Sequence, residues 1–145
     1  MLFLPLLDHA WRLPRLPHSR PHVISWILLL ALLAAPAVWV QHYPAHALTT
    51  LLLTALPEEW FFRGYFMGRI GTGLRANLIA STLFSLMHAL TRDWMTALLV
   101  FVPSLFYGWL YQRNRDLPLL VLLHSLSNVV FALYLAQYVA AFLYK

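Results

Sequence analysis

Long apolar runs alternate with short polar segments along the chain, and this pattern predicts helices that cross a membrane. The apolar runs occupy residues 23–40, 45–67, 76–90, 94–111 and 117–144. A helix needs about 20 predominantly apolar residues to cross the hydrocarbon core of a bilayer. The last run is longer than this, so we expect it to tilt, bend or divide. The sequence therefore predicts an all-α membrane protein, a helical bundle of about five transmembrane segments.

The first 21 residues differ from the rest because proline and arginine are frequent there. These residues are Pro5, Arg12, Pro14, Arg15, Pro17, Arg20 and Pro21. Repeated prolines prevent a long regular helix, so we expect residues 1–21 to form a basic, proline-rich interfacial leader and residues 22–145 the transmembrane core. The small residues around Ala35 and Ala47 resemble signal-peptidase sites. The long basic region and the later apolar runs nevertheless favour a retained span.

The distribution of basic residues predicts the orientation of the spans. If the N-terminus lies in the cytoplasm, only Arg92 and Lys145 fall on the outer side. The cytoplasmic arginines are then Arg12, Arg15, Arg20, Arg69, Arg75, Arg113 and Arg115. Because basic residues accumulate in cytoplasmic loops, we expect the N-terminus inside and the C-terminus outside.

Composition supports the membrane assignment and excludes several other classes. Only 10% of the residues are charged and 61% are hydrophobic, whereas a soluble domain carries about 25% charged residues. The net charge of +5 does not indicate a nucleic-acid partner, because the basic residues are scattered rather than clustered. The absence of cysteine excludes disulfides, a thiolate nucleophile and cysteine ligands for a metal.

Two adjacent glutamates, Glu58 and Glu59, lie inside the second apolar run and are the only glutamates in the chain. A carboxylate at membrane depth costs about 3 kcal/mol or more, so it persists where it is paired or functional. On a helix, Glu59 and Arg63 share a face and can form an ion pair. Glu58 points about 100° away and is therefore the candidate for chemistry. Pro57, directly before it, predicts a kink or a fresh helical start.

Two other spans carry polar residues at helical spacing. Phe84 and His88 share one face of the third span, and His124 and Asn128 share one face of the fifth. With Glu58, these histidines lie roughly 10–18 Å from the cytoplasmic ends of their spans, at about 1.5 Å per residue. Each alone is also consistent with an interhelical hydrogen bond that only joins helices, worth about 1 kcal/mol. Together they predict a site inside the membrane.

Ser85 lies one turn from His88 and raises the possibility of a serine nucleophile. A serine inside a helix more often bonds to the backbone of its own helix. We therefore do not assign Ser85 to catalysis.

The three motifs resemble those of a known family. Residues 58–63 match EExxxR, residues 84–88 match FxxxH, and residues 124–128 match HxxxN, in the order found in the CPBP family of intramembrane proteases. This is the CAAX-protease and bacteriocin-processing family, related to the prenyl-protein endoprotease Rce1. The resemblance covers about half of the chain, and three motifs in order on apolar helices are more specific than any one alone. It implies an all-helical membrane core and an endopeptidase.

The resemblance also implies a role for each motif residue. Glu58 would activate the attacking water with His88 as its partner, and His124 and Asn128 would stabilise the oxyanion. Side chains expected to support the site structurally are Glu59, Arg63 and Phe84.

The chemistry of amide hydrolysis agrees with these roles and leaves one mechanistic alternative. Hydrolysis needs a base for the water and donors aimed at the developing oxyanion. Zinc held by Glu58, His88 and His124 with a bound water would be a second way to activate the nucleophile. We favour a site without metal or other cofactor, because the chain lacks HExxH and Asn128 is a poor zinc ligand.

Two functions of other classes remain open: a small proton-linked transporter that uses Glu58 and the histidines as a relay, and a non-catalytic immunity or scaffold protein. Relatives of the resembled family act on prenylated CAAX proteins, bacteriocin leaders or C-terminal membrane-anchored sorting tails. The small size favours the last of these. We expect a membrane-associated protein or peptide as the partner, in a prokaryotic inner membrane.

Overall fold

The computed structural model describes residues 4–8, 10–11, 17 and 20–143, and within them all regular structure is helical. The chain divides into two compact units. The first comprises Met1–Pro17 with Glu58–Leu120, and the second comprises His18–Pro57 with Val121–Lys145. The all-α prediction is therefore confirmed. Of the basic residues used to predict orientation, Arg12, Arg15 and Lys145 lie outside the described residues.

The helices follow the predicted apolar runs closely. In the first unit they are α1 (Leu4–Leu7), η3 (Trp60–Phe66), α5 (Met67–Ile70), α6 (Leu74–Thr91) and α7 (Trp94–Asn114). In the second unit they are α2 (Arg20–Ala34), η1 (Ala35–Val38), α3 (Tyr43–Thr49), η2 (Thr50–Ala55), η4 (Phe131–Leu135) and α9 (Ala136–Leu143). Two helices contain the boundaries between units, α4 (Leu56–Glu59) and α8 (Leu117–Val130).

Three of the helical stretches are long and apolar enough to cross a membrane by length and composition: Pro21–Val38, Trp94–Asn114 and Leu117–Val139. The other two predicted spans are also helical, within residues 43–70 and in α6. The number of five spans and the orientation stay predictions. Together these helices make the chain an integral membrane protein.

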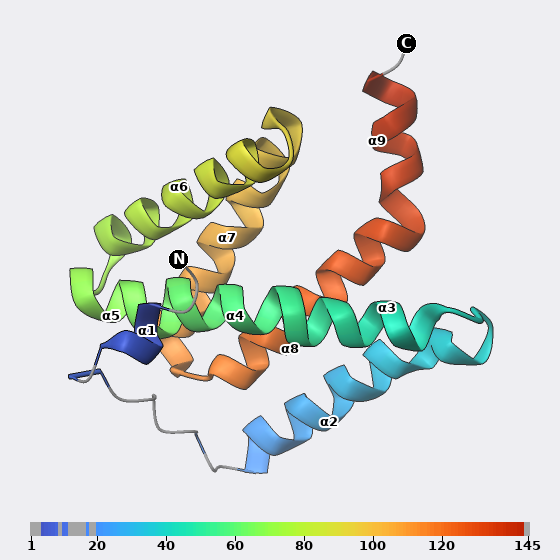
Figure 1. Cartoon of the computed structure of the whole chain (residues 1–145). Coiled ribbons are helices and arrows are strands. Elements are labelled where there is room, and N and C mark those ends of the chain that lie inside the picture. The colour runs from blue at the N-terminus through green and yellow to red at the C-terminus, as the bar shows by residue number, and fades with distance from the viewer. Residues whose placement is uncertain (1–3, 9, 12–16, 18–19, 144–145) are drawn as a thin grey trace. The chain divides into compact units, whose positions relative to one another are not determined.

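The backbone stays helical from residue 43 to residue 70, through Pro57, and appears as one unbroken ribbon from α3 to α5 (Figure 1). Proline has no N–H to donate and clashes with the carbonyl one turn earlier. Here π-helical segments, η2 and η3, lie on either side of α4, and the N–H of Leu56 bonds to the carbonyl of Leu51 five residues before it. The wider helix accommodates Pro57, so no new helix begins at the glutamates.

The last apolar run is likewise helical to Leu143, as α8, η4 and α9 in succession. It changes to π-helix over Phe131–Leu135 and returns to α-helix at Ala136. A π-helical insertion is the feature that interrupts this long run.

Residues 68–75 separate the second and third apolar runs, and their three glycines predict a loop. The loop is shorter in the structure, because α5 continues to Ile70 and α6 begins at Leu74. Gly71 and Gly73 turn the chain with φ of +110° and +92°, a region that favours glycine. The side-chain amide of Gln112 fixes this loop from α7. It accepts from the N–H of Gly73 at 3.2 Å and donates to the Gly73 carbonyl at 2.9 Å.

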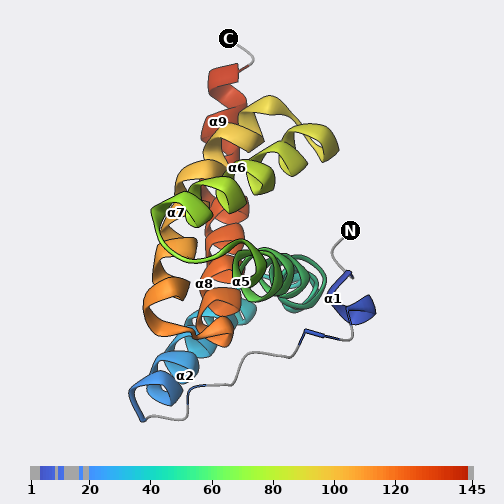
Figure 2. The ribbon, with the colours of Figure 1, turned by 90° about the vertical axis from the view of Figure 1, so that its left-hand side faces the viewer.

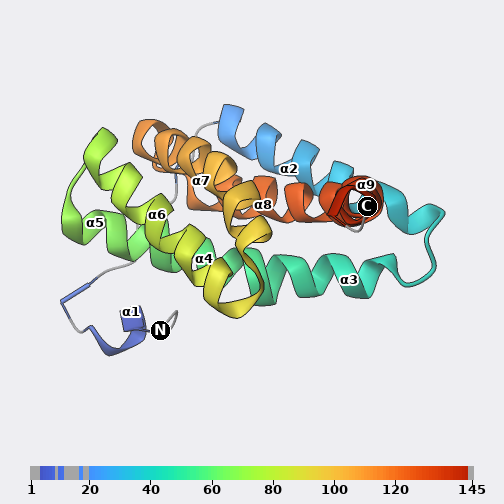
Figure 3. The ribbon, with the colours of Figure 1, turned by 90° about the horizontal axis from the view of Figure 1, so that it is seen from above.

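Helices α6 and α7 lie side by side, joined by a short turn (Figure 3). Asp93 caps the start of α7 by accepting from the N–H and hydroxyl of Thr96, each at 2.7 Å. These hydrogen bonds hold the pKa of Asp93 below its usual value. The contact between the helices is close at Gly108, where an added Cβ would lie 1.8 Å from Oδ1 of Asn77. Only glycine permits that approach.

Each unit has its own core. In the first unit Phe61, Phe62 and Phe84 form a buried aromatic cluster. In the second unit the buried residues are Leu33, Tyr43, Ala47 and Val129. The α2 and α3 helices adjoin in this unit, and the Tyr43 hydroxyl donates to the Leu33 carbonyl.

The described part of the predicted leader packs against η3 and α5 within the first unit; its first helix, α1, is labelled in Figure 2. The ring of Trp11 lies 5.8 Å from that of Trp60 and 5.9 Å from that of Tyr65, measured between centroids. Asp8 pairs with Arg69. The leader is thus anchored to the helix that follows the glutamates.

Candidate active site

The glutamates lie at the junction of α4 and η3, where both are buried. Glu59 is fully buried, and its Oε2 lies 3.2 Å from Nε of Arg63, which is itself only 1% exposed. The i,i+4 ion pair expected from the sequence is therefore present. A buried charge without its partner costs several kcal/mol, so each member of this pair depends on the other.

Arg63 connects this pair to two other helices. Its Nη2 donates to the carbonyl oxygen of Ser104 at 3.0 Å and to the Ser104 hydroxyl at 2.7 Å. Its guanidinium also lies over the ring of Phe84, 5.0 Å from the centroid. One side chain thereby joins η3 to α7 and α6, which fixes the backbone that carries the glutamates.

Sequence reasoning missed Ser104, which is 1% exposed. Its signal was a serine directly after Pro103 inside an apolar run, where proline removes a backbone hydrogen bond and exposes polar groups in the helix. Asn77 was also missed as a structural residue. Its Nδ2 donates to the Leu105 carbonyl at 2.8 Å, and its Oδ1 accepts from the Ser81 hydroxyl at 3.3 Å.

Glu58 and His88 belong to the same unit and are almost equally buried, at 8% and 6% exposure. Glu58 adjoins Glu59 in α4, so the two carboxylates project from different faces of the helix. The ion pair with Arg63 holds Glu59.

The orientation of His88 is set by a backbone carbonyl one turn earlier in its own helix, α6. Its Nδ1 lies 3.0 Å from the carbonyl oxygen of Phe84, and the two rings are 4.5 Å apart. A carbonyl oxygen only accepts, so Nδ1 carries the proton and donates. In neutral His88 the lone pair is then on Nε2, which makes Nε2 the nitrogen able to exchange a proton.

Phe84 contributes to the site by packing as well as by its carbonyl. Its ring meets that of Phe62 edge to face at 5.1 Å, and Phe62 meets Phe61 in the same way at 5.0 Å. The Phe84 ring also contacts both Arg63 and His88, so this aromatic cluster packs against the two polar side chains.

Ser85 is not arranged as a nucleophile. Its hydroxyl donates to the carbonyl of Ala97 on α7 at 2.6 Å. The expectation of a bond to its own helix is wrong, because the neighbouring helix presents a carbonyl within reach.

His124 and Asn128 lie on α8 in the second unit, one turn apart and on one face of the helix. His124 is buried, at 5% exposure, and Asn128 is partly buried. The structure thus places Glu58, Glu59, Arg63, Phe84 and His88 in the first unit and His124 with Asn128 in the second. That the two groups form one site stays a prediction.

The described residues contain no group of three histidine, aspartate or glutamate side chains positioned to hold a metal ion. The zinc alternative requires His124 of the second unit beside Glu58 and His88 of the first. It is a question for experiment.

Comparison with known proteins agrees with the motifs. The sequence model of the Rce1-like family, described as type II CAAX prenyl endopeptidase, matches residues 21–130. No curated protein and no solved structure matches the chain. The matched region includes all three motifs and excludes most of the leader.

Proposed function

The chain belongs to the Rce1-like family of type II CAAX prenyl endopeptidases, and from this membership we propose that it hydrolyses its substrate with a water activated by Glu58. The family makes it a protease of the membrane, whose substrate is a membrane-associated protein. The buried Glu58 beside the Glu59–Arg63–Ser104 network is the observation that carries the proposal.

Glu58 acts as the general base. It removes a proton from water as the water attacks the peptide carbonyl, a step that a positioned carboxylate accelerates by roughly 10²–10⁴-fold. Glu59 cannot substitute, because its charge is neutralised by Arg63 at 3.2 Å. The network to Ser104 keeps the backbone of α4 and η3 in place during the reaction.

His88 acts as the partner of Glu58. Because Nδ1 donates to the Phe84 carbonyl, Nε2 is directed to the opposite side of the ring. There its lone pair accepts the proton that Glu58 took from water and passes it to the leaving amine. This arrangement resembles the orientation of catalytic imidazoles by a hydrogen bond to their second nitrogen.

His124 and Asn128 supply the oxyanion hole. An imidazole N–H and an amide N–H₂ on one helix face can donate to the same oxygen as negative charge develops on it. Loss of one such donor typically lowers kcat by about 10²–10³-fold.

The substrate is a protein tail or leader held at the membrane, with a C-terminal sorting tail favoured over a prenylated CAAX protein or a bacteriocin leader. We place the enzyme in a prokaryotic inner membrane. A direct test incubates purified protein in lipid nanodiscs with one peptide of each class and follows cleavage by mass spectrometry. Glu58→Gln should abolish cleavage, and a metal chelator should not.

Two results would contradict this mechanism. Full cleavage by the Glu58→Gln variant would mean that Glu58 is not the general base. Loss of cleavage with chelator and recovery with Zn²⁺ would instead favour the zinc alternative built on Glu58, His88 and His124.

A further inference from the structure

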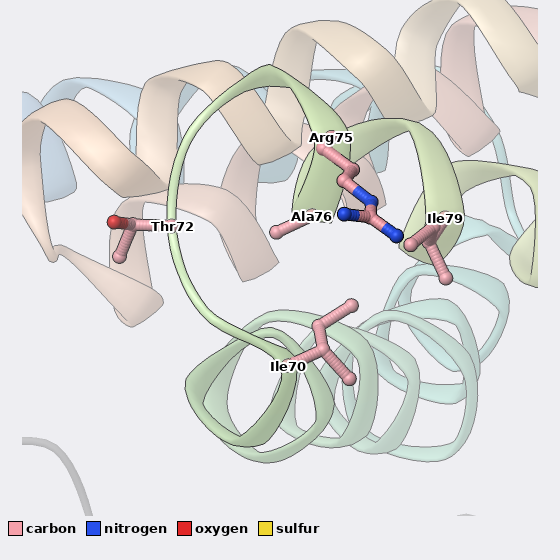
Figure 4. Close-up of a pocket in the computed structure, with 5 residues that line it drawn as sticks. All are labelled: Ile70, Thr72, Arg75, Ala76 and Ile79. Carbon is pink, nitrogen blue, oxygen red and sulfur yellow. The ribbon is translucent and has the colours of Figure 1, made fainter.

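A cavity of about 320 Å³ lies in the first unit, where α5 turns into α6. It is lined by Ile70, Thr72, Arg75, Ala76 and Ile79. Figure 4 shows the Arg75 guanidinium between Ala76 and Ile79, above Ile70. The cavity therefore combines one cation and one hydroxyl with aliphatic walls.

Arg75 differs from the neighbouring Arg69 in its contacts. Arg69 pairs with Asp8 and lies over the ring of Tyr65, whereas no ion pair or hydrogen bond of the Arg75 side chain occurs among the described residues. Its charge is thus available to an anion from outside the chain.

The cavity has a rigid wall. Thr72 lies between Gly71 and Gly73, and the Gln112 amide holds Gly73 through both its N–H and its carbonyl. These two hydrogen bonds hold the loop against α7.

An apolar stripe continues from Arg75 along α6. Ile79, Leu83 and Leu86 follow at helical spacing and stay about 40% exposed (41%, 39% and 42%). From Arg75 to Leu86 the helix rises about 16 Å, at 1.5 Å per residue, which is close to half of the roughly 30 Å hydrocarbon thickness of a bilayer. The stripe matches one lipid leaflet in length.

We propose that this cavity binds the phosphate of an anionic phospholipid, with Arg75 on the headgroup and an acyl chain along Ile79, Leu83 and Leu86. Guanidinium and phosphate form strong charge-assisted hydrogen bonds. The segment lies between two predicted spans, at the level where headgroups occur. This site is separate from Glu58 and independent of the proposed catalytic mechanism.

The test measures lipid retention, not proteolysis. Purified protein is incubated with vesicles of equal parts phosphatidylglycerol and phosphatidylcholine, extracted in mild detergent, and analysed by native mass spectrometry for bound lipid. Arg75→Gln should reduce retained phosphatidylglycerol by about fivefold, the loss of one arginine contact near the headgroups, and Arg75→Lys should retain most of it.

Arg92→Gln is the matched control, because Arg92 directly follows the end of the same helix and is also exposed. It should leave retention unchanged. Helicity is checked by circular dichroism, and if Arg75→Gln has lost it, Ile79→Glu replaces it, since a carboxylate in the cavity should repel the phosphate with a similar loss.

Three results would overturn the proposal. Equal retention by Arg75→Gln and wild type would mean that the lipid is only annular, and equal losses in Arg75→Gln and Arg92→Gln would indicate diffuse surface charge. Displacement of the lipid by millimolar inorganic phosphate, or by a peptide with a C-terminal carboxylate, would assign the cavity to a soluble anion or to a substrate terminus.

Discussion

At the scale of single residues, the ion pair between Glu59 and Arg63 makes a sharp prediction. Both side chains are almost fully buried. Replacing either one by alanine leaves the other charge buried and should cost about 3–5 kcal/mol. We expect low abundance in membranes and a lower unfolding temperature for Glu59→Ala and for Arg63→Ala.

The apolar double variant Glu59→Leu/Arg63→Met is the control for that prediction, because replacing both charges leaves no unpaired group. It should be more abundant than either single variant. Normal abundance of both single variants would contradict the assignment of Glu59 to structural support and of Glu58 to catalysis.

Ser104 makes a second prediction at this scale. Its carbonyl and hydroxyl both accept from Arg63, so Ser104→Ala removes one charge-assisted hydrogen bond and should lower the free energy of unfolding by about 1.5–3 kcal/mol. Ser104→Thr keeps the hydroxyl and should lose less. Thr82→Ala, at an exposed position on α6, is the control in the same thermal unfolding series, and an equal loss there would remove the special role of Ser104.

At the scale of helices, the close contact of α6 with α7 can be tested at Gly108. A Cβ at this position would lie 1.8 Å from Oδ1 and 2.6 Å from Cγ of Asn77, so Gly108→Ala must displace Asn77 from its bond to Leu105. Overpacking of this kind costs about 1–3 kcal/mol.

Gly68→Ala is the matched control, because nothing lies within 4 Å of its added Cβ and alanine favours a helix by up to about 1 kcal/mol. Thermal unfolding should therefore move in opposite directions for the two variants. An unchanged unfolding temperature for Gly108→Ala would mean that α6 and α7 can move apart at this contact at little cost in free energy.

The leader's contact with α5 predicts a response to acid. Desolvation raises the pKa of Asp8, but hydrogen bonds from Tyr65, Arg69 and the N–H of Ala10 outweigh it and hold this pKa below its ordinary value of 3.8. A lowered pKa stabilises the folded contact above the ordinary value, and the contribution is lost as pH falls through the lowered one. The protection factors for hydrogen exchange at Asp8 and Trp11 should be high near neutral pH and fall in strong acid, after correction for the intrinsic exchange rate at each pH.

Asp8→Asn should show the faster exchange at neutral pH as well. Identical exchange in the variant and in wild type at neutral pH would mean that the ion pair does not hold the leader.

At the scale of the whole chain, hydrophobic patterning predicted the helices because each apolar run is long and is separated from the next by a short polar segment. It did not foresee the π-helical bonding on either side of Pro57, which apolar patterning does not encode. It also overestimated the length of the loop between the second and third apolar runs. Helix continuation to Ile70 depends on packing, not on local glycine content.

The site divides in the same way. Motif spacing predicted the ion pair between Glu59 and Arg63, because helical geometry places residues i and i+4 on one face. The roles of Glu58 and His88 stay predictions. Ser104 and Asn77 were missed because their roles depend on which helix packs beside them. Such contacts between helices, as at Gly108, are set by tertiary packing.

The most direct test of a glutamate-based protease compares the protein termini in membranes of cells that carry wild-type protein or Glu58→Gln at equal abundance. The account predicts that one set of C-terminal or leader fragments disappears in the variant, and the lost termini then identify the substrate. Identical termini in the two membranes, when both contain the peptide class that is cleaved in nanodiscs, would contradict it.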